Sequence, residues 1–247
     1  MSQKPQSSQI HSGLGFRIKP DINRPNQELI KKFCQFEIPD ISDLMNRLYT
    51  FSPEIKNLVN EQEIIGTACT VKVYPSDNLM VHKALDIAQP GDVIVVDGSG
   101  SLHNAIIGDL IATKAKYRRI AGFIIDGLIR DLPEMKKVGI PVYAKGVTPI
   151  GPLHRGPGEI NFPISCGGVV VNAGDIVYGD TNGIVVIPQE FTEDLLTKLS
   201  AKKARLKAYV DNVKKGIFDN DWVDQILADH QCLVYPTTEK QNLSQNN

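Results

Sequence analysis

Short runs of β-branched residues alternate with helix-patterned segments through the middle of the chain, and this alternation limits the possible fold more than any other feature. The runs are TACTVKVYP, GDVIVVDG, AGFIIDG and IPVYAKG, within residues 67–146. Between these runs lie segments with the apolar spacing of a helix, namely SDNLMVHKALDIA, SLHNAIIGDLIATKAKYRR and the short RDLPEMKKV. Strand, helix, strand, helix is the order found in parallel α/β units. The sequence therefore predicts an α/β fold built on a parallel sheet.

A second set of strands follows these units. The segments VIVVD and FIID are almost wholly apolar, as expected for central strands covered on both faces. The later stretch GGVVVNAGDIVYGDTNGIVVIP contains two or three strands joined by tight turns, and Asn182-Gly183 is a strong hairpin signal. We therefore expect an antiparallel β layer in addition to the parallel units.

Helical patterns flank the strands at both ends. Residues 26–57 contain two such segments, NQELIKKFCQF and PDISDLMNRLY, and EFTEDLLTKLSAKKARLKAYVDNVKK predicts a long helix that ends at Gly216. A chain of 247 residues is long enough for one sizeable core. The expected organisation is a flexible segment over 1–25, one domain with a C-terminal helical extension over 26–235, and a flexible tail over 236–247.

The charge balance excludes one class of partner. The 27 basic and 28 acidic residues give a net charge of -1, so no global field attracts nucleic acid. The densest basic stretch has a spacing that fits the exposed face of an amphipathic helix. It comprises Lys114, Lys116, Arg118 and Arg119.

The cysteines and the apolar runs bear on location. The four cysteines form no Cys-x-x-Cys pair, which argues against zinc-ribbon and thioredoxin-type sites and favours buried free thiols. The start of the chain, MSQKPQSSQIHSG, has no apolar core of the signal-peptide kind, and no run of 18 apolar residues occurs. We expect a cytoplasmic protein with no membrane partner.

Two strand-to-helix junctions carry the polar residues of most interest. Ligands of α/β proteins collect at such junctions, because helix N-termini present free amide groups there. After FIID stand Arg130 and Asp131: Arg offers a planar fork for a carboxylate, and Asp offers hard oxygen for Mg²⁺ or Mn²⁺. The alternative is that Arg130 pairs elsewhere and Asp131 only caps the following helix. Spacing alone leaves both interpretations open.

Asp109 lies in the helix-patterned segment after VIVVD, in the context Gly108-Asp109-Leu110. A carboxylate among Ala, Ile and Leu costs desolvation energy unless another group compensates its charge. A metal ion or its water shell is one such group, and exposure on the polar side of the helix is the alternative. The pattern does not choose between them.

The context GDLIATKAKYRRIAGFIIDGLIRDLPEMKKVGIPVYAKGVTP, which joins Asp109 to Arg130 and Asp131, resembles the RraA-like proteins. These include the 4-hydroxy-4-methyl-2-oxoglutarate and 4-carboxy-4-hydroxy-2-oxoadipate aldolases. The resemblance extends from about Asp40 through PGDVIVVDG to NAGDIVYGDTNGIVVIP. It implies a swivelling β/β/α fold, assembled as a homotrimer or homohexamer with active sites between subunits.

The resemblance also implies roles for particular residues. Asp131 would ligate Mg²⁺ or Mn²⁺ largely through water, Arg130 would bind the keto-acid end of the substrate, and Asp109 would hold metal-bound water. The amides at the helix start would receive the pyruvyl carboxylate, so that the implied substrate-binding set is Gly108, Leu110, Ile111 and Arg130. The implied reaction is cleavage of a 4-hydroxy-2-keto acid to pyruvate, with oxaloacetate decarboxylation as a side activity.

One part of the family pattern has no match. Aldolases of this type use a glutamate from the C-terminal region of a neighbouring subunit at the metal site, whereas this region is lysine-rich here. Glu190 and Glu193 are the nearest acids, and neither can be assigned that role. RraA itself is a protein that binds and inhibits ribonuclease E, and it keeps the same Asp and Arg-Asp motif. A non-catalytic regulator is therefore the alternative function.

Three further features have weaker functional interpretations. Lys145 at a strand end is a candidate Schiff-base lysine, although an isolated lysine there is more often solvated or paired. The turn at Gly98 and Gly100 is similar to a dinucleotide loop but lacks the third glycine, since His103 stands there. His103 is a candidate proton carrier or a packing residue. His82, His154 and His230 show no spacing that suggests zinc.

Overall fold

The parallel strands predicted from the middle of the sequence form the centre of the structure. The computed structural model describes residues 9–235. Strands β3 (Ile64–Val73), β4 (Asp92–Ile107), β5 (Gly122–Ile129) and β6 (Val142–Val147) lie next to one another in that order, and each adjacent pair is parallel. Helices α3 (Leu79–Ile87), α4 (Asp109–Tyr117) and α5 (Leu132–Val138) connect them in turn. The predicted α/β units are confirmed.

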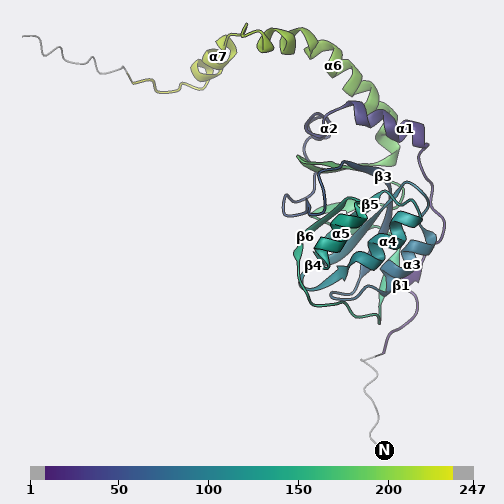
Figure 1. Ribbon diagram of the computed structural model, residues 1–247. Helices are drawn as coiled ribbons and strands as arrows, with labels where there is room; N and C mark the ends of the chain where they lie inside the picture. Colours follow the sequence, from purple (N-terminus) through teal and green to yellow (C-terminus); the bar gives the residue numbers. More distant parts are fainter. Residues whose placement is uncertain (1–8, 236–247) are drawn as a thin grey trace, which may run out of the picture. The chain divides into compact units, whose positions relative to one another are not determined.

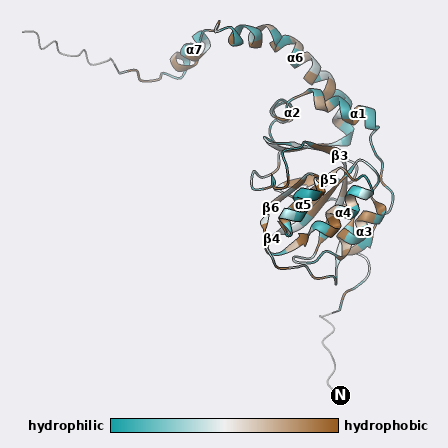
Figure 2. Cartoon of the chain, viewed as in Figure 1, coloured by the Kyte–Doolittle hydropathy of each residue, from teal (hydrophilic) through white to brown (hydrophobic). Residues whose placement is uncertain are grey.

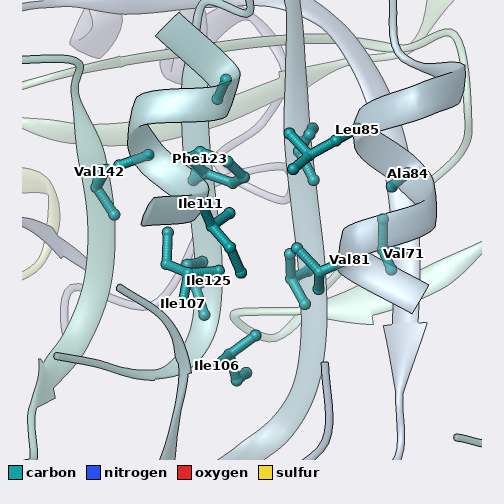
Figure 3. Close-up of a cluster of buried hydrophobic side chains, with 14 of the residues drawn as sticks. Val71, Val81, Ala84, Leu85, Ile106, Ile107, Ile111, Phe123, Ile125 and Val142 are labelled. Atoms are coloured by element: carbon teal, nitrogen blue, oxygen red, sulfur yellow. The ribbon is translucent and has the colours of Figure 1, made fainter. Parts of the chain in front are cut away.

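Helices α3, α4 and α5 lie together over one face of these strands (Figure 1). Figure 3 shows part of the core between them, where Ile111 of α4 lies near Ile107 and Ile125 of the sheet. Along VIVVD, Ile94 and Val96 belong to this core, whereas the alternate residues Val93 and Val95 belong to the core on the opposite face. Both faces of the central strands are buried, which explains why residues 93–96 of this run are all apolar.

Antiparallel strands cover the second face. β10 (Ile176–Asp180) pairs with β11 (Gly183–Ile187) through the predicted hairpin, and β10 also pairs antiparallel with the first half of β3. A short hairpin of β8 (Ile164–Cys166) and β9 (Val169–Val171) adds to this layer. In β11, Ile184 and Val186 face the sheet core while Val185 and Ile187 face a third core. The layer is therefore buried on both sides.

Three short strands lie towards the edges of the sheet. β7 (Gly158–Ile160) pairs antiparallel with the end of β3 and parallel with β1 (Phe16–Ile18), and β2 (Lys56–Asn57) pairs with β6. Within the described residues these elements complete a sheet of nine strands. The fold class expected from the sequence, parallel α/β units with an added antiparallel β layer, is the one observed.

The helical lead-in covers the outer side of β10 and β11. It consists of α1 (Gln27–Lys31), the 3-10 helix η2 (Lys32–Gln35) and α2 (Ile38–Leu44). Their apolar residues share a core with the start of α6 (Thr192–Lys214), which follows the 3-10 helix η3 (Gln189–Phe191). Hydrophilic and hydrophobic residues alternate along the helices (Figure 2). The second helix ends earlier than its pattern predicts, because Asn46 and Arg47 adopt positive φ angles.

Two expectations need correction. Residues 101–107 were predicted to be helical, but they form the second part of β4, and α4 begins only at Asp109. The cysteines are all free, but only Cys69 and Cys166 are buried, whereas Cys34 and Cys232 are exposed. The four basic residues Lys114, Lys116, Arg118 and Arg119 are exposed as predicted.

The chain divides into two compact units, residues 1–201 and 202–247. Of the predicted flexible segment 1–25, residues 1–8 lie outside the described part, while Phe16–Ile18 form β1 and Arg24 pairs with Asp92 at 2.8 Å. The second unit contains the later turns of α6 and a short helix that was not predicted, α7 (Asp221–Asp229). The predicted tail, 236–247, lies outside the described residues. No helix in the described range is long and apolar enough to cross a membrane.

Candidate active site

The first polar junction lies where β4 ends and α4 begins. Gly108 has an extended backbone and stands at the N-cap, and Asp109 is the first residue of the helix. The first helical bond runs from the amide of Ala112 to the carbonyl of Gly108 at 3.1 Å. No side chain caps this end, so the amides of the first turn, including those of Leu110 and Ile111, remain available to a ligand. Asp109 therefore lies at the helix terminus, whereas its sequence pattern had suggested the helix interior.

The second junction lies beside the first. Arg130 directly follows β5, and its amide donates a hydrogen bond to the carbonyl of Ile107 at 3.0 Å, which joins the two junctions. Asp131 adopts a left-handed conformation with φ 56° at the N-cap of α5, and its side chain makes no capping hydrogen bond. The interpretation of Asp131 as a simple helix cap is therefore wrong. A left-handed non-glycine residue stores strain, which is tolerated most readily by Asn and Asp.

The side chains of Arg130 and Asp131 pair with each other. Nε of Arg130 lies 3.2 Å from Oδ2 of Asp131, and the two side chains are 40% and 38% exposed. The contact has ion-pair distance without hydrogen-bond geometry, because Nε is buried and has no hydrogen-bond partner among the described residues. The guanidinium thus keeps donors for a ligand, and its charge is only partly compensated.

Two glycines make room for this pair. A Cβ atom on Gly108 would contact Oδ2 of Asp131 and would lie 3.1 Å from Cγ of Arg130. A Cβ atom on Gly151 would lie 2.5 Å from Nη1 of Arg130. Larger residues at either position would displace the guanidinium or the carboxylate.

A pocket of about 210 Å³ opens at the joined junctions. Its walls come from both junctions, from α3 and from the loop after β6, and the lining residues are Asn78, His82, Gly108, Asp109, Leu110, Ile111, Arg130, Pro152 and His154. The structure thus brings together five of the six residues selected from the sequence. The sixth, Asp131, does not line the pocket but adjoins it through Arg130, whose Nε lies 3.2 Å from Oδ2 of Asp131.

The sequence did not identify three polar residues of this pocket. Nδ1 of His154 lies 2.6 Å from Oδ1 of Asn78, and the rings of His82 and His154 meet edge to face with centroids 5.6 Å apart. Burial lowers the pKa of His82, and Lys114 and His154 lower it further. By contrast His103, the histidine considered for proton transfer, is exposed on β4 and does not line the pocket.

Lys145 is paired and does not fit a Schiff-base role. Its Nζ lies 2.8 Å from Oδ1 of Asp126 and 3.4 Å from Oε2 of Glu54. The hydrogen bond to Asp126 raises the pKa of Lys145, against the opposing effect of burial. A nucleophilic lysine needs the opposite pKa shift.

The turn at Gly98 and Gly100 lies inside β4 and does not open a helix, so it does not form a dinucleotide loop.

The donors at the junctions fit a divalent cation that keeps most of its water. Asp131 presents a half-exposed carboxylate, and Asp109 adds a second carboxylate to the pocket. Among the described residues, no three His, Cys, Asp or Glu side chains converge on one point. Hard carboxylate oxygens are the ligands that Mg²⁺ prefers, typically through one or two carboxylates and several waters. Glu190 and Glu193 are exposed in η3 and α6 and do not line the pocket.

Two proteins with the same name share much of the sequence of this chain. A protein of Halalkalibacterium halodurans named "Putative 4-hydroxy-4-methyl-2-oxoglutarate aldolase" is 40% identical over 190 residues, which cover 75% of this chain and 90% of the relative. A protein of the same name from Azotobacter vinelandii is 35% identical over 63% of this chain and 96% of its own length.

Solved structures agree with this relationship. The RNA-processing inhibitor RraA from Thermus thermophilis superposes with a TM-score of 0.58 at 30% identity, over 62% of this chain and 93% of that one. Streptomyces coelicolor RraAS2 superposes with a TM-score of 0.69 at 24% identity, over 76% and 98%. Residues 38–186 match the family described as RraA-like, Aldolase/RraA. The chain therefore belongs to the RraA-like family.

Proposed function

We propose that the protein is a metal-dependent lyase that cleaves a 4-hydroxy-2-keto acid to pyruvate in the pocket formed by Gly108, Asp109, Leu110, Ile111 and Arg130, with Asp131 adjoining Arg130. The observation that carries the proposal is the meeting of an incompletely paired guanidinium with the free amides of a helix N-terminus in a pocket of about 210 Å³. Both groups bind anions, and the volume suits a small organic acid. The aldolase names of relatives at up to 40% identity support the same reaction class.

Different residues of the pocket bind different parts of the substrate. The amides of Leu110 and Ile111 receive the carboxylate of the keto acid at the positive end of α4. Arg130 binds the adjoining keto oxygen with its remaining donors. Gly108 allows the substrate and Asp131 to approach each other, because a side chain there would occupy the space of the Asp131 carboxylate.

Asp131 would hold Mg²⁺ or Mn²⁺ and Asp109 would hold water of the same ion. When bound, the cation supplies positive charge to the keto oxygen of the substrate. The residues of the chain add to this effect at fixed positions. Arg130 and the N-terminus of α4 stabilise negative charge on the pyruvyl half as the C3–C4 bond breaks. Oxaloacetate decarboxylation places its electron pair on the same atoms, so we propose it as a second activity.

A chelator experiment tests the proposal. We expect that EDTA abolishes pyruvate release from 4-hydroxy-4-methyl-2-oxoglutarate and from oxaloacetate, and that Mg²⁺ or Mn²⁺ restores both. The readout is pyruvate, coupled to NADH oxidation by lactate dehydrogenase. Lyase activity that EDTA does not change contradicts the metal-dependent mechanism. A protein that releases no pyruvate from any 4-hydroxy-2-keto acid contradicts the enzymatic function.

Assembly forms part of the proposal. Among residues 9–235, no three side chains of the metal-ligating kinds converge, so a homotrimer or homohexamer would complete each site with a neighbouring subunit. Sedimentation of the purified protein at several concentrations determines the number of subunits. A stable monomer with full activity would contradict this part.

A non-catalytic regulator that binds ribonuclease E is the second candidate, favoured by the likeness to the Thermus thermophilis inhibitor structure. A pull-down with purified ribonuclease E tests it directly. Specific binding, together with no lyase activity on any 2-keto acid, would place this function first.

A further inference from the structure

His154 reaches the candidate pocket from a loop that is firmly held. On one side of it, the carbonyl of Leu153 accepts a hydrogen bond from the amide of Asn78 at 3.0 Å. On the other side, the amide of Arg155 donates to Oδ2 of Asp77 at 2.6 Å, and Asp77 is only 2% exposed. These hydrogen bonds hold the backbone on both sides of His154 in place.

The hydrogen bonds of Asn78 determine which nitrogen of His154 carries a proton. Nδ2 of Asn78 donates to the carbonyl of Ile106 at 2.8 Å, which fixes the orientation of the amide, because exchanging its N and O would place two acceptors in contact. Oδ1 therefore faces Nδ1 of His154 at 2.6 Å and must accept a hydrogen bond from a protonated Nδ1. In the neutral imidazole, this leaves Nε2 unprotonated and able to accept a proton.

The histidine beside it adds no charge. Burial, Lys114 and His154 all lower the pKa of His82 below its ordinary value, so His82 is neutral at neutral pH. Its ring packs edge to face against His154 at 5.6 Å. His154 therefore packs against a neutral ring, while its Nδ1 is held by Asn78.

We propose that His154 is the catalytic residue that removes the C4 hydroxyl proton of the substrate, and that Asn78 is the positioning residue that keeps Nε2 free for this step. The inference rests on the proposed lyase function and adds the proton acceptor that this function requires. It replaces His103, which is exposed outside the pocket.

The step balances without a further reactant. The hydroxyl proton moves to Nε2 of His154, the oxygen left behind forms the carbonyl of the departing product, and the C3–C4 bond breaks. Its electron pair passes to the pyruvyl half, which is held by Arg130 and the start of α4. A proton added at C3 then gives pyruvate, and nothing is oxidised or reduced.

Two substrates separate proton removal from binding. Cleavage of 4-hydroxy-4-methyl-2-oxoglutarate needs the base, whereas oxaloacetate decarboxylation removes no proton from the substrate. With Mg²⁺ present, we expect His154→Gln to lower kcat for the hydroxy acid about 100-fold or more. The same variant should lose far less of its oxaloacetate decarboxylation, because that reaction needs no base. The matched control, His103→Gln, should leave both reactions unchanged. Equal loss of both reactions in His154→Gln, or full retention of hydroxy-acid cleavage, would overturn the inference.

A measurement without substrate distinguishes failure of this inference from failure of the proposed function. The ¹⁵N chemical shifts of the His154 ring at neutral to mildly alkaline pH should show Nδ1 protonated and Nε2 unprotonated. In Asn78→Ala, the opposite tautomer should gain population and kcat should fall with KM little changed. A ring protonated at Nε2 in the wild type overturns the assignment even if the enzyme is active. If the wild type shows the expected tautomer but releases no pyruvate from any substrate, the lyase function and the catalytic role of His154 are both overturned. Asn78 then remains only the group that orients the ring.

Discussion

Gly108 is the residue on which the geometry of the candidate site depends most. Its backbone is extended with φ -139°, a conformation open to any residue, so backbone strain does not require glycine there. The requirement comes from space, because a Cβ atom would contact Oδ2 of Asp131 and crowd Arg130.

We therefore predict that Gly108→Ala removes most lyase activity while the thermal midpoint stays close to that of wild type. A methyl group that displaces Asp131 by a fraction of an ångström disturbs catalysis more than stability. Gly151→Ala is the matched control, since its Cβ would meet only the far end of Arg130, at 2.5 Å from Nη1. It should raise KM with a smaller effect on kcat. Equal activity of Gly108→Ala and wild type would show that the pair does not need this space.

Lys145 should not form a Schiff base with a keto acid. The hydrogen bond to Asp126 raises its pKa, so Lys145 remains an ammonium at neutral pH and is a poor nucleophile. Borohydride added with pyruvate should therefore leave the protein mass unchanged and the activity intact. A mass increase that maps to Lys145 would revive the Schiff-base mechanism.

Sequence reasoning found part of the site and missed part of it for a physical reason. Arg130 and Asp131 are adjacent in the chain and follow an obvious strand, so their proximity needed no tertiary information. His154 lies 76 positions from its partner Asn78, and neither residue belongs to a recognisable motif. Only the packing of α3 against the loop after β6 brings them together.

Among the elements, β4 shows where periodicity fails. Ala105, Ile106 and Ile107 fit a helical stripe as well as a buried strand, and the pattern favoured a helix that starts too early. The strand continues because its second half still pairs with β5, after register shifts between residues 97 and 107. This continuation moves Asp109 from the interior of a helix to its N-terminus, which makes it available to the pocket.

The edge formed by β1 and β7 should respond to pH. Burial raises the pKa of Glu159, but the hydrogen bond from the amide of Gly15 and the charge of Arg17, whose Nε lies 2.6 Å away, lower it by more. A lowered folded-state pKa adds stability above the ordinary glutamate pKa, and this stability is lost as the pH falls through the folded-state value.

Denaturant unfolding of wild type and Glu159→Gln checks this prediction. Wild type should be the more stable at pH 7, and the difference in free energy of unfolding should shrink at acidic pH. Glu61→Gln, at an exposed glutamate, should show no such dependence. A difference that stays constant from pH 7 to pH 3 would contradict the assigned interaction.

At the scale of the whole molecule, the three packed cores all lie within residues 1–201. None of the described residues after Gly216 is buried, and only Val223 of α7 is partly covered. Alternating strand and helix patterns predicted the layers of the first unit well, because burial imposes periodicity on the sequence. The division near residue 201 could not be predicted, because the helical pattern of α6 runs through it without a break.

A chain that ends at Gly216 should therefore keep the fold of residues 1–201. We expect hydrogen-exchange protection of the amides in β3, β4, β5 and β6 to match that of the full chain. Loss of this protection would show that the second unit stabilises the first. Retained protection with reduced activity would indicate that the C-terminal region of a neighbouring subunit contributes to the site.

The proposed function depends on Arg130, which lines the pocket, and on the adjoining Asp131. The most direct measurement is kcat/KM for pyruvate release from 4-hydroxy-4-methyl-2-oxoglutarate with Mg²⁺, in wild type, Asp131→Ala and Arg130→Ala. Asp21→Ala, at an exposed carboxylate, serves as the control. We predict that both site variants lose activity by about 100-fold or more while they remain folded and the control matches wild type. Full activity in either site variant would contradict the account.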